Sequence, residues 1–387
     1  MNILMLAYEF RPDLGGIADY SHNLARGISL KGHSVMVACG SECAKGPYRT
    51  VSVKSPASRS PLAYVRSFFY FLRLIRDNSI DAVFLSYLSY YHSGPYLLML
   101  ACLAAGRPLY LFVYALELDD GGRSKKKIKR WMAFNFARKI FAISEYTRKL
   151  AGRFTNGKKE IVIARPCVDI AMLEEAAEQA RQMISERYSL RGKKVLLTLG
   201  RLVERKGMDS VIRVMPELVK RFPELIYIVA GEGPERDSLR SMVSRLGMED
   251  HVIFTGVVTE KEKKGLLKSC DVFVMPCRGL SDYDAEGFGI VFAEAAVFNK
   301  PSVAGRSGGA PEVVLDGISG FTVDPLDPEQ LAEKLLFLLG NPRKARAMGA
   351  RGRLFVERRL TPESLSESVL SALQGQTVKR EKDRFCF

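Results

Sequence analysis

Histidine and patterned cysteine are scarce in this sequence. Four histidines and seven cysteines occur among 387 residues, and neither type forms the short-spaced pairs that hold a zinc ion. The cysteines are odd in number and scattered, with no Cys-x-x-Cys pair, which predicts reduced thiols and not a disulfide framework. We therefore expect no zinc site, and chemistry that proceeds mostly without imidazole.

Long apolar runs are also absent. The longest, residues 95–106, is about half of the roughly 20 residues that a membrane-spanning helix needs. Residues 1–10 have no basic region before their apolar run and no small-residue cleavage site, so we interpret them as a buried strand and not as a signal peptide. The sequence therefore predicts a cytoplasmic chain that does not cross a bilayer.

The composition is that of a globular protein, with 47% hydrophobic and 26% charged residues. Single hydrophobic cores stop growing at about 250–300 residues, so a chain of this length predicts two domains. Strand-like and helical runs alternate, which is typical of α/β domains with doubly wound parallel sheets. The strand-like runs are residues 2–7, 34–39, 82–86, 109–114 and 139–143, then 194–199, 226–230, 252–255, 272–275 and 301–304.

A helical stretch rich in Ala, Glu and Arg, residues 171–187, separates the two sets of strands. We therefore predict one domain at residues 1–170 and a second at 171–360. Residues 361–375 are expected to form a C-terminal helix, and the polar tail 376–387 is expected to fray. Ligands are expected in the crevice between the domains, at the carboxyl ends of the strands, where open α/β sheets bind them.

The net charge is +15, and most of the positive excess lies in the first half: residues 1–175 carry 25 basic and 14 acidic residues. The segment from Arg123 to Lys139 has eight basic residues, no acidic one and three aromatics, and residues 64–76 mix five aromatics with three arginines. Both segments fit amphipathic helices that dock on an anionic membrane surface. The alternative is a solvated helix face whose aromatics are core. No RNA- or DNA-binding signature accompanies the charge, so nucleic acid is not expected as a partner.

Glycine turns follow several predicted strands. Gly15 and Gly16 open a helix after the first strand, where free N–H groups can face an anion, although the pair alone also fits an ordinary βα turn. Residues 231–234, Gly-Glu-Gly-Pro, hold two of the three glycines of a dinucleotide fingerprint, because Arg236 stands in place of the third. We interpret Gly231 as part of a turn beside a nucleotide, and the incomplete fingerprint disfavours a nicotinamide cofactor.

Two cations follow the predicted strand at residues 194–199. Arg201 and Lys206 lie in a loop bracketed by glycines, at the end of the sheet where ligands bind. Arginine can fork onto phosphate oxygens and lysine adds a mobile point charge, so the pair suits a diphosphate. Both would stabilise negative charge on a departing phosphate. The alternative is an ordinary charged loop tip.

The most informative stretch contains Glu286 and Glu294, which are separated by seven residues. Between them, a predicted loop leads into a predicted helix that begins near Ile290. The loop contains Gly287, Phe288 and Gly289. Loop amides and the positive end of that helix would hold phosphate, Glu286 would face a sugar, and Glu294 would accept hydrogen bonds from ribose hydroxyls. The helix is apolar around Glu294, so this carboxylate is predicted to be buried and to need a partner. The alternative is a capped helix with solvated acids.

Together these motifs resemble the retaining GT-B glycosyltransferases of family 4. The motifs are Gly15-Gly16, Gly-Arg-Leu-x-x-x-Lys-Gly at 200–207, Gly-Glu-Gly-Pro at 231–234, Glu286 with Glu294, and Ser-Gly-Gly-x-Pro-Glu at 307–312. The resemblance is strong over residues 195–320 and looser before residue 170. It implies two facing Rossmann-like domains, with a C-terminal helix that crosses back onto the first.

The resemblance also implies roles for individual residues. The cations of the 200–207 loop would contact the donor diphosphate, and Glu294 the ribose. Glu286 would contact the transferred sugar together with the amides of Phe288 and Gly289. No metal and no cofactor are implied, the donor being a UDP-, GDP- or ADP-sugar. Retention in this family is explained by front-face attack, in which the donor phosphate accepts the acceptor's proton, so no protein nucleophile is required.

One position departs from the family pattern. Relatives often carry His-Gly where this chain has Tyr114 and Ala115. Tyr114 would still present a hydroxyl to the sugar or to its leaving phosphate, because a phenol donates a hydrogen bond without being charged. The alternatives are a nucleotide-sugar-binding homologue with impaired catalysis and, after it, a nicotinamide-dependent oxidoreductase.

The sequence therefore predicts a metal-independent hexosyltransferase of cell-surface polysaccharide or lipopolysaccharide biosynthesis. Its acceptor would be a glycan or a lipid-linked molecule at the inner face of the membrane, because the first domain is basic. The predicted catalytic residues are Glu286, Arg201, Lys206 and Tyr114. The predicted donor site adds Gly15, Gly16, Gly231, Gly287, Phe288, Gly289, Ile290 and Glu294.

Overall fold

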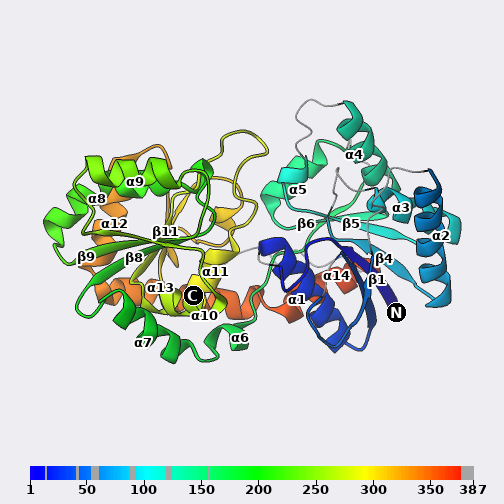
Figure 1. Cartoon of the computed structure of the whole chain (residues 1–387), viewed down its shortest axis with the longest axis horizontal. Helices are drawn as coiled ribbons and strands as arrows, with labels where there is room; N and C mark the ends of the chain where they lie inside the picture. The colour runs from blue at the N-terminus through cyan, green and yellow to red at the C-terminus, as the bar shows by residue number, and fades with distance from the viewer. Residues whose placement is uncertain are drawn as a thin grey trace. The chain divides into compact units, whose positions relative to one another are not determined.

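The computed structural model describes residues 1–13, 15–40, 43–53, 61–87, 93–118, 124–155, 157 and 159–375. The polar tail predicted at 376–387 and the basic residue Arg123 lie outside the described residues. The chain forms two units (Figure 1). Unit 1 comprises Met1–Pro166 together with the chain from Pro362 onwards, and unit 2 comprises Cys167–Thr361.

Unit 1 is built on a seven-stranded parallel sheet in the order β3-β2-β1-β4-β5-β6-β7. The strands are β1 (Asn2–Ala7), β2 (Ser34–Cys39), β3 (Arg49–Ser52), β4 (Ala82–Leu85), β5 (Leu109–Val113), β6 (Lys139–Ala142) and β7 (Ile161–Ile163). Ile3 of β1 pairs with Val35 on one side and with Ala82 on the other. The strand order therefore reverses between β1 and β4, which is the topological switch point of a Rossmann-like sheet.

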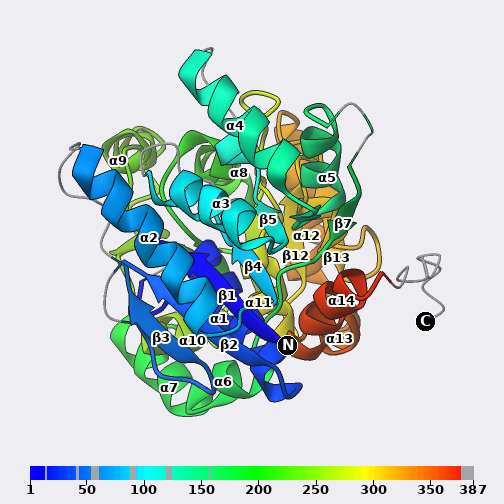
Figure 2. The same cartoon turned by 90° about the vertical axis from the view of Figure 1, so that its right-hand side faces the viewer.

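Helices cover both faces of the unit 1 sheet. They are α1 (Gly16–Leu30), α2 (Pro61–Asp77), α3 (Gly94–Ala105), the short 3-10 helix η1 (Leu116–Leu118), α4 (Ser124–Phe136), α5 (Glu145–Gly152) and α14 (Pro362–Leu373). Because βαβ crossovers are right-handed, α1 lies on one face and α2 to α5 lie on the other. The C-terminal helix α14 packs on α1. Figure 2 shows α2 beside α3 and α4 next to α3, in agreement with their contacts.

Unit 2 has a six-stranded parallel sheet in the order β10-β9-β8-β11-β12-β13. The strands are β8 (Lys194–Leu199), β9 (Leu225–Ala230), β10 (Val252–Gly256), β11 (Val272–Met275), β12 (Ser302–Gly305) and β13 (Gly320–Val323). The switch point lies between β8 and β11. All six residues of β9 are buried, as expected for a parallel strand that is covered on both faces.

The helices of unit 2 form a layer on each side of this sheet. They are α6 (Ile170–Glu174), α7 (Ala177–Arg187), η2 (Glu204–Lys206), α8 (Met208–Arg221), α9 (Arg236–Arg245), α10 (Glu260–Ser269), α11 (Ile290–Val297), η3 (Ala310–Glu312), α12 (Pro328–Gly340) and α13 (Pro342–Arg359). Contacts join α8 to α9 and α12 in one layer, and join α10 to α7 and α11, and α11 to α13, in the other. Val211, Met215 and Leu218 of α8 recur at helical spacing and belong to one core cluster.

The predicted alternation of strands and helices is confirmed. Every predicted strand coincides with an observed strand to within one residue at each end. The helix predicted at residues 171–187 is instead two helices, α6 and α7, because Ala176 between them adopts a left-handed conformation with φ of 55°. The short strands β3, β7 and β13 were not predicted.

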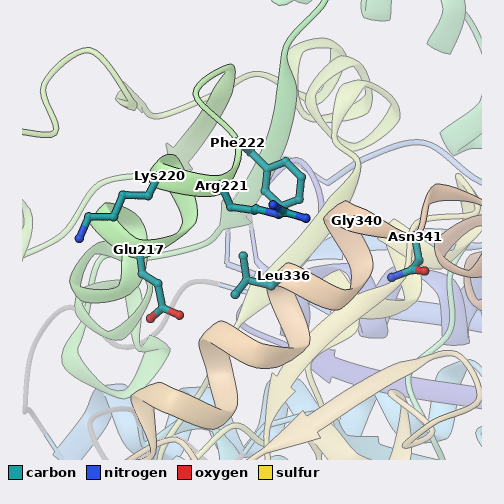
Figure 3. A pocket seen from close by; sticks show the side chains of 7 residues that line it. All are labelled: Glu217, Lys220, Arg221, Phe222, Leu336, Gly340 and Asn341. Atoms are coloured by element: carbon teal, nitrogen blue, oxygen red, sulfur yellow. The ribbon is translucent and has the colours of Figure 1, made fainter.

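A surface pocket of about 710 Å³ in unit 2 lies between the ends of α8 and α12 (Figure 3). Helix α8 leads into the start of β9, so the pocket lies near the amino edge of the sheet, away from the carboxyl edge where ligands bind in such folds. None of the predicted site residues lines it. The lining residues are Glu217, Lys220, Arg221, Phe222, Leu336, Gly340 and Asn341.

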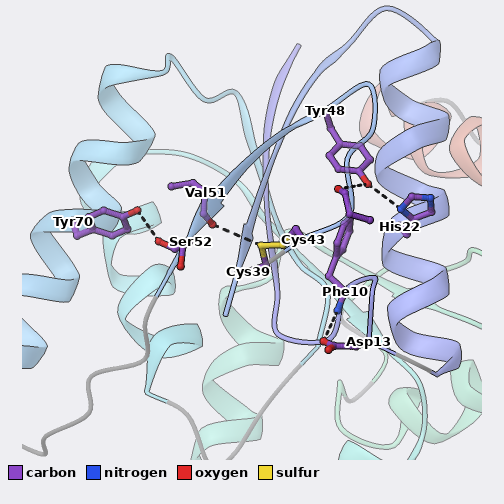
Figure 4. The surroundings of a disulfide bond; sticks show 10 residues. Phe10, Asp13, His22, Cys39, Cys43, Tyr48, Val51, Ser52 and Tyr70 are labelled. Atoms are coloured by element: carbon purple, nitrogen blue, oxygen red, sulfur yellow. Dashed lines mark hydrogen bonds between the residues drawn. A yellow bond between two sulfur atoms is a disulfide. The ribbon is translucent and has the colours of Figure 1, made fainter. Parts of the chain in front are cut away.

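The cysteines depart from the prediction at one place. Cys39 and Cys43 form a disulfide (Figure 4), so the prediction of reduced thiols is wrong for this pair. Cys39 ends β2, and its Cα atom lies 6.9 Å from that of Cys43. Cys270 and Cys277 are buried thiols, as predicted, and burial raises the pKa of Cys270 to about 12.

Two properties of the described part of the chain bear on function. None of its helices combines the length and the apolar character that crossing a bilayer requires. Within the same residues, no three or more side chains of His, Cys, Asp and Glu gather where they could hold a metal ion.

Candidate functional site

The predicted residues of unit 2 gather in loops at the carboxyl edge of the sheet. The N–H of Arg278 donates to the carbonyl oxygen of Arg205 at 2.8 Å, which ties the loop after β11 to the loop after β8. The N–H of Gly309 donates to the carbonyl oxygen of Glu286, also at 2.8 Å, which ties the loop after β12 to the loop after β11. Segments 73 and 23 residues apart in sequence thus form one connected surface, as the carboxyl ends of parallel strands should.

The central contact of this surface is an ion pair between Lys206 and Glu286. Nζ of Lys206 lies 2.5 Å from Oε2 of Glu286, and the two side chains are 12% and 15% exposed. Burial alone raises the pKa of Glu286, but Lys206, Arg205 and the N–H of Gly289 outweigh burial, so the pKa is lowered. Glu286 is therefore ionised at neutral pH, and its negative charge is held against a cation.

Two arginines of the Lys206 loop differ in their contacts. Arg201, predicted to contact phosphate, is exposed, and its guanidinium forms no salt bridge with any described residue. Arg205 contacts Asp284, with Nη1 lying 3.2 Å from Oδ1. Its buried Nε has no hydrogen-bond partner among the described residues. Arg205 was not predicted from the sequence as a site residue, although Arg205 lies in the same loop as Arg201 and Lys206.

Glycines allow these loops to approach one another backbone to backbone. A Cβ atom on Gly308 would lie 2.1 Å from the carbonyl oxygen of Glu286, and one on Gly309 would lie 2.3 Å from that of Gly287. A Cβ atom on Gly231 would lie 2.0 Å from the carbonyl oxygen of Gly200. No side chain fits at these positions, so the glycine motifs set the distance between the loops.

Helix α11 begins directly after Gly289, so Ile290 is its first residue, as predicted. The side chain of Phe288 is buried and therefore belongs to the core. The N–H of Gly289 interacts with the carboxylate of Glu286. The N–H of Gly289 and the carboxylate of Glu286 were both predicted to contact the sugar. In this structure they interact with each other.

Glu294 is buried, as predicted, and it has a partner within the protein. Oε1 of Glu294 lies 2.9 Å from Nζ of Lys263 on α10, and both residues are less than a tenth exposed. The burial of Glu294 is therefore compensated without a ligand. Lys263 was missed from the sequence, although it shares a helical face with the buried residues Leu266 and Leu267.

Two predicted residues belong to the start of α1 in unit 1. Gly15 precedes the helix with φ of 147°, a conformation that L-residues other than glycine rarely adopt. Gly16 is the first helical residue. A Cβ atom on Gly15 would meet nothing within 4 Å, so the backbone is open on that side of the turn. The approach of a ligand to the helix start stays a prediction.

Tyr114 directly follows β5 in unit 1 and is buried. Its hydroxyl lies 3.4 Å from Oγ of Ser86, which lies 2.5 Å from Oγ of Ser21. Burial raises the pKa of the phenol, against the smaller effect of the Ser86 hydrogen bond. Tyr114 is therefore a neutral hydroxyl at the end of a buried chain of hydroxyl groups.

A second buried acid, Glu117, supports the same turn and was missed from the sequence. Its carboxylate accepts hydrogen bonds from the N–H groups of Tyr114 and Ala115. Ala115 has φ of 129°, in the region that favours glycine. Burial raises the pKa of Glu117 to about 7, despite the opposing backbone hydrogen bonds.

The geometry of both units agrees with known protein families. Residues 181–355 match the family model described as glycosyl transferases group 1, and residues 14–171 match the model described as glycosyltransferase family 4. The two matches do not overlap, and together they span most of the chain.

One curated relative is the GDP-mannose-dependent alpha-(1-6)-phosphatidylinositol monomannoside mannosyltransferase of Mycolicibacterium smegmatis. It is 40% identical over 220 residues, which are 57% of this chain and 57% of the relative. The chain thus spans little more than half the length of this curated relative.

Two solved structures share the fold along nearly the whole chain. HepE of Anabaena, in complex with UDP and glucose, has a TM-score of 0.76 at 19% identity and covers 97% of this chain and 100% of its own. The lipopolysaccharide outer core galactosyltransferase WaaB, in its apo form, has a TM-score of 0.69 at 15% identity and covers 97% and 99%. The fold is therefore the GT-B fold, with two Rossmann-like units. Given the two family matches and the motifs at the carboxyl edge of unit 2, the chain belongs to glycosyltransferase family 4.

Proposed function

We propose that the protein is a retaining hexosyltransferase that uses a nucleotide diphosphate sugar and needs no metal ion. The observation that carries the proposal is the largely buried pair of Lys206 and Glu286, with the exposed Arg201 in the same loop as Lys206. Cations suit a diphosphate and a carboxylate suits sugar hydroxyls, so one cluster provides contacts for both parts of the donor. Membership of family 4 supports the same activity.

In the proposed reaction, the bond between the anomeric carbon and the β-phosphate oxygen breaks, and the acceptor hydroxyl oxygen bonds to that carbon on the same face. The acceptor's proton passes to the departing phosphate oxygen. Lys206 and Arg201 stabilise the negative charge that grows on the diphosphate, and such preorganised charges are usually the largest single contribution to catalysis. Glu286 orients the sugar by accepting hydrogen bonds from its hydroxyls.

A panel of donors tests the proposal. Calorimetric titration with UDP-, GDP- and ADP-sugars, each followed by an assay of hydrolysis or transfer, identifies the nucleotide. The panel follows the names of the similar proteins, one of which is GDP-mannose-dependent and another of which binds UDP and glucose. NMR of the product should show the donor's anomeric configuration. Inversion, or turnover that stops when a chelator is added, would contradict the proposed mechanism.

We further propose a glycan or lipid-linked acceptor, used in cell-surface polysaccharide or lipopolysaccharide biosynthesis. Two similar proteins support this, because one is named for a phosphatidylinositol monomannoside and the other for the lipopolysaccharide outer core. Transfer assays with a lipid-extract acceptor and with a water-soluble glycan separate the two kinds of acceptor.

We also propose that unit 1 docks on an anionic membrane surface through a three-helix face. This face consists of exposed apolar and basic side chains on α2, α3 and α4. Those of α2 recur every three or four positions and so share one side of the helix. Each basic residue near an anionic surface contributes about 1 kcal/mol. The face comprises Leu62, Val65, Arg66, Phe69 and Arg73 of α2, Leu103 of α3, and Lys127, Ile128 and Trp131 of α4.

The single tryptophan makes this docking measurable. Trp131 is 64% exposed on α4, so its emission should shift to shorter wavelength when vesicles containing phosphatidylglycerol are added. Phe69→Asp on α2 should weaken flotation with these vesicles. Val257→Asp is the matched control, because Val257 is equally apolar and is 70% exposed in unit 2. Equal flotation with neutral and anionic vesicles would show that the basic residues of this face do not contribute to membrane docking.

A second candidate is a donor-binding homologue with impaired turnover. The observation that favours it is Tyr114, which stands where relatives often carry histidine and whose hydroxyl is bonded to the buried Ser86. Donor binding without turnover in the panel above, followed by a gain of turnover in Tyr114→His, would support impairment. Steady turnover by the unaltered chain would exclude it.

A further inference from the structure

The buried ion pair between Lys263 and Glu294 has no role in the function proposed so far. It joins the middle of α10 to the middle of α11, and Nζ of Lys263 also lies 3.0 Å from Oε2 of Glu260, one turn earlier in α10. Of the eight residues of α11, Glu294 is the only one that is not apolar. The ion pair thus lies in surroundings that are otherwise apolar.

A buried pair of this kind is not explained by stability alone. Removing two charges from water costs several kcal/mol per ion, and replacing a buried pair with packed apolar residues is often neutral or stabilising. Breaking such a pair is costly, because one charge remains buried without its partner. Stability is therefore not a sufficient reason for this pair.

The elements that carry the pair are held closely. Gly265 of α10 approaches α7 so tightly that a Cβ atom there would lie 2.4 Å from the carbonyl oxygen of Ala180. Leu266 and Leu267, the next residues, are buried. Lys263 is thus supported by a helix that cannot easily shift, which is what a precisely oriented binding group requires of its support.

We propose that Lys263 is a positioning residue, which holds the carboxylate of Glu294 ionised and oriented toward the two ribose hydroxyls of the nucleotide donor. A carboxylate has about four acceptor sites, and the hydrogen bond from Lys263 to Oε1 uses one of them. The inference rests on the proposed function, because it requires that a nucleotide binds at the carboxyl edge of unit 2. Beyond the proposed function, the inference names Lys263 as the residue through which Glu294 distinguishes ribose from deoxyribose.

The test compares two nucleotides that differ only at the ribose. With the base identified by the donor panel, calorimetry measures Kd for the nucleoside diphosphate and for its 2′,3′-dideoxy analogue. The wild type should prefer the ribose form by about 10-fold to 100-fold, the range for losing hydrogen bonds to a charged buried group. In Lys263→Met the preference should fall close to 1, and in Lys263→Arg it should be intermediate, because the charge is kept and the geometry is changed.

Lys194→Met is the matched control. Lys194 is a partly buried lysine of the same unit, and its Nζ donates to the carbonyl oxygen of Leu339 at 3.1 Å. It begins β8 and therefore lies at the amino edge of the sheet, away from the site. This variant should lose some stability and keep the full preference for ribose. Unfolding midpoints of all variants show how much each substitution costs in stability.

The possible outcomes separate this inference from the proposed function. Preference in the wild type that persists unchanged in Lys263→Met overturns the positioning role. Equal loss of affinity for both nucleotides in that variant shows a merely structural lysine and also overturns it. No preference in the wild type removes the ribose role of Glu294, and with it the inference, while leaving the transferase proposal intact. If Lys263→Met does not fold, the test uses Lys263→Arg alone. A ribose preference that is unchanged in Lys263→Arg contradicts the positioning role of Lys263.

Discussion

Replacing Lys206 with methionine removes an ammonium group that lies 2.5 Å from Glu286 and leaves the carboxylate where it was. Breaking a buried ion pair costs about 3–5 kcal/mol, because the remaining charge is buried without compensation. Both side chains keep a small exposed fraction, 12% and 15%, so solvent screens part of that charge. We therefore expect unit 2 to lose about 2–3 kcal/mol of unfolding free energy at neutral pH.

The size of this loss should depend on pH. In the wild type, burial raises the pKa of Glu286, but Lys206 and its neighbours outweigh burial and the pKa is lowered. A carboxyl group whose pKa is lowered by folding stabilises the protein above its unfolded-state pKa, and this contribution is lost as pH falls. Without Lys206, burial becomes dominant and the pKa rises, so the variant is stabilised when Glu286 takes up a proton. The stability gap between the two proteins should narrow from about pH 7 to about pH 5.

Urea unfolding measures this gap. Far-UV circular dichroism follows both units, and the fluorescence of Trp131 follows unit 1, which the substitution does not touch. The double variant Lys206→Met/Glu286→Gln should recover most of the lost stability, because it removes both charges of the pair. A gap that does not change with pH, or a double variant as unstable as the single one, would refute the reasoning. In the transfer assay, Lys206→Met should lower kcat by about 100-fold to 1,000-fold.

Three further predictions concern other parts of the molecule. Gly308→Ala should displace the Glu286 loop, because its Cβ atom would lie 2.1 Å from a backbone oxygen; we expect turnover to fall with the domain still folded by circular dichroism. Glu117→Gln should make the stability of unit 1 less dependent on pH. Folding raises the pKa of Glu117 to about 7, so its contribution is present at low pH and is lost as pH rises through 7, which Trp131 fluorescence in urea can follow. Glu294→Ala should weaken donor binding by about 1–3 kcal/mol in calorimetry, and unchanged affinity would remove its assigned role.

The long buried strands were predictable because parallel strands covered on both faces are continuous apolar runs. β3 and β7 carry no such signal: β3 is mostly exposed, and all three residues of β7 are half-buried. The break between α6 and α7 was also hidden, because Ala176 adopts a left-handed conformation that its side chain does not favour. No glycine or proline marks the position in the sequence.

Motifs located the site loops, but they did not give the partners of the charged residues. Glu286 and Glu294 were identified by their spacing, and burial of Glu294 was predicted from the apolar residues around it. Its partner Lys263 lies 31 residues earlier on another helix, and only the sheet order brings those helices together. Glu117 was missed for a different reason, since its role is to accept from the two N–H groups of a local turn whose conformation the sequence did not reveal.

The contacts of Gly308 and Gly309 with the Glu286 loop are made by main-chain atoms alone. The frame that positions Glu286 therefore does not depend on the side chains of the loop that follows β12. The loop before Glu286 is different, because its Asp284 forms an ion pair with Arg205. Substitutions around the two glycines can thus accumulate without moving Glu286 or its lysine, whereas Asp284 is constrained by its ion pair.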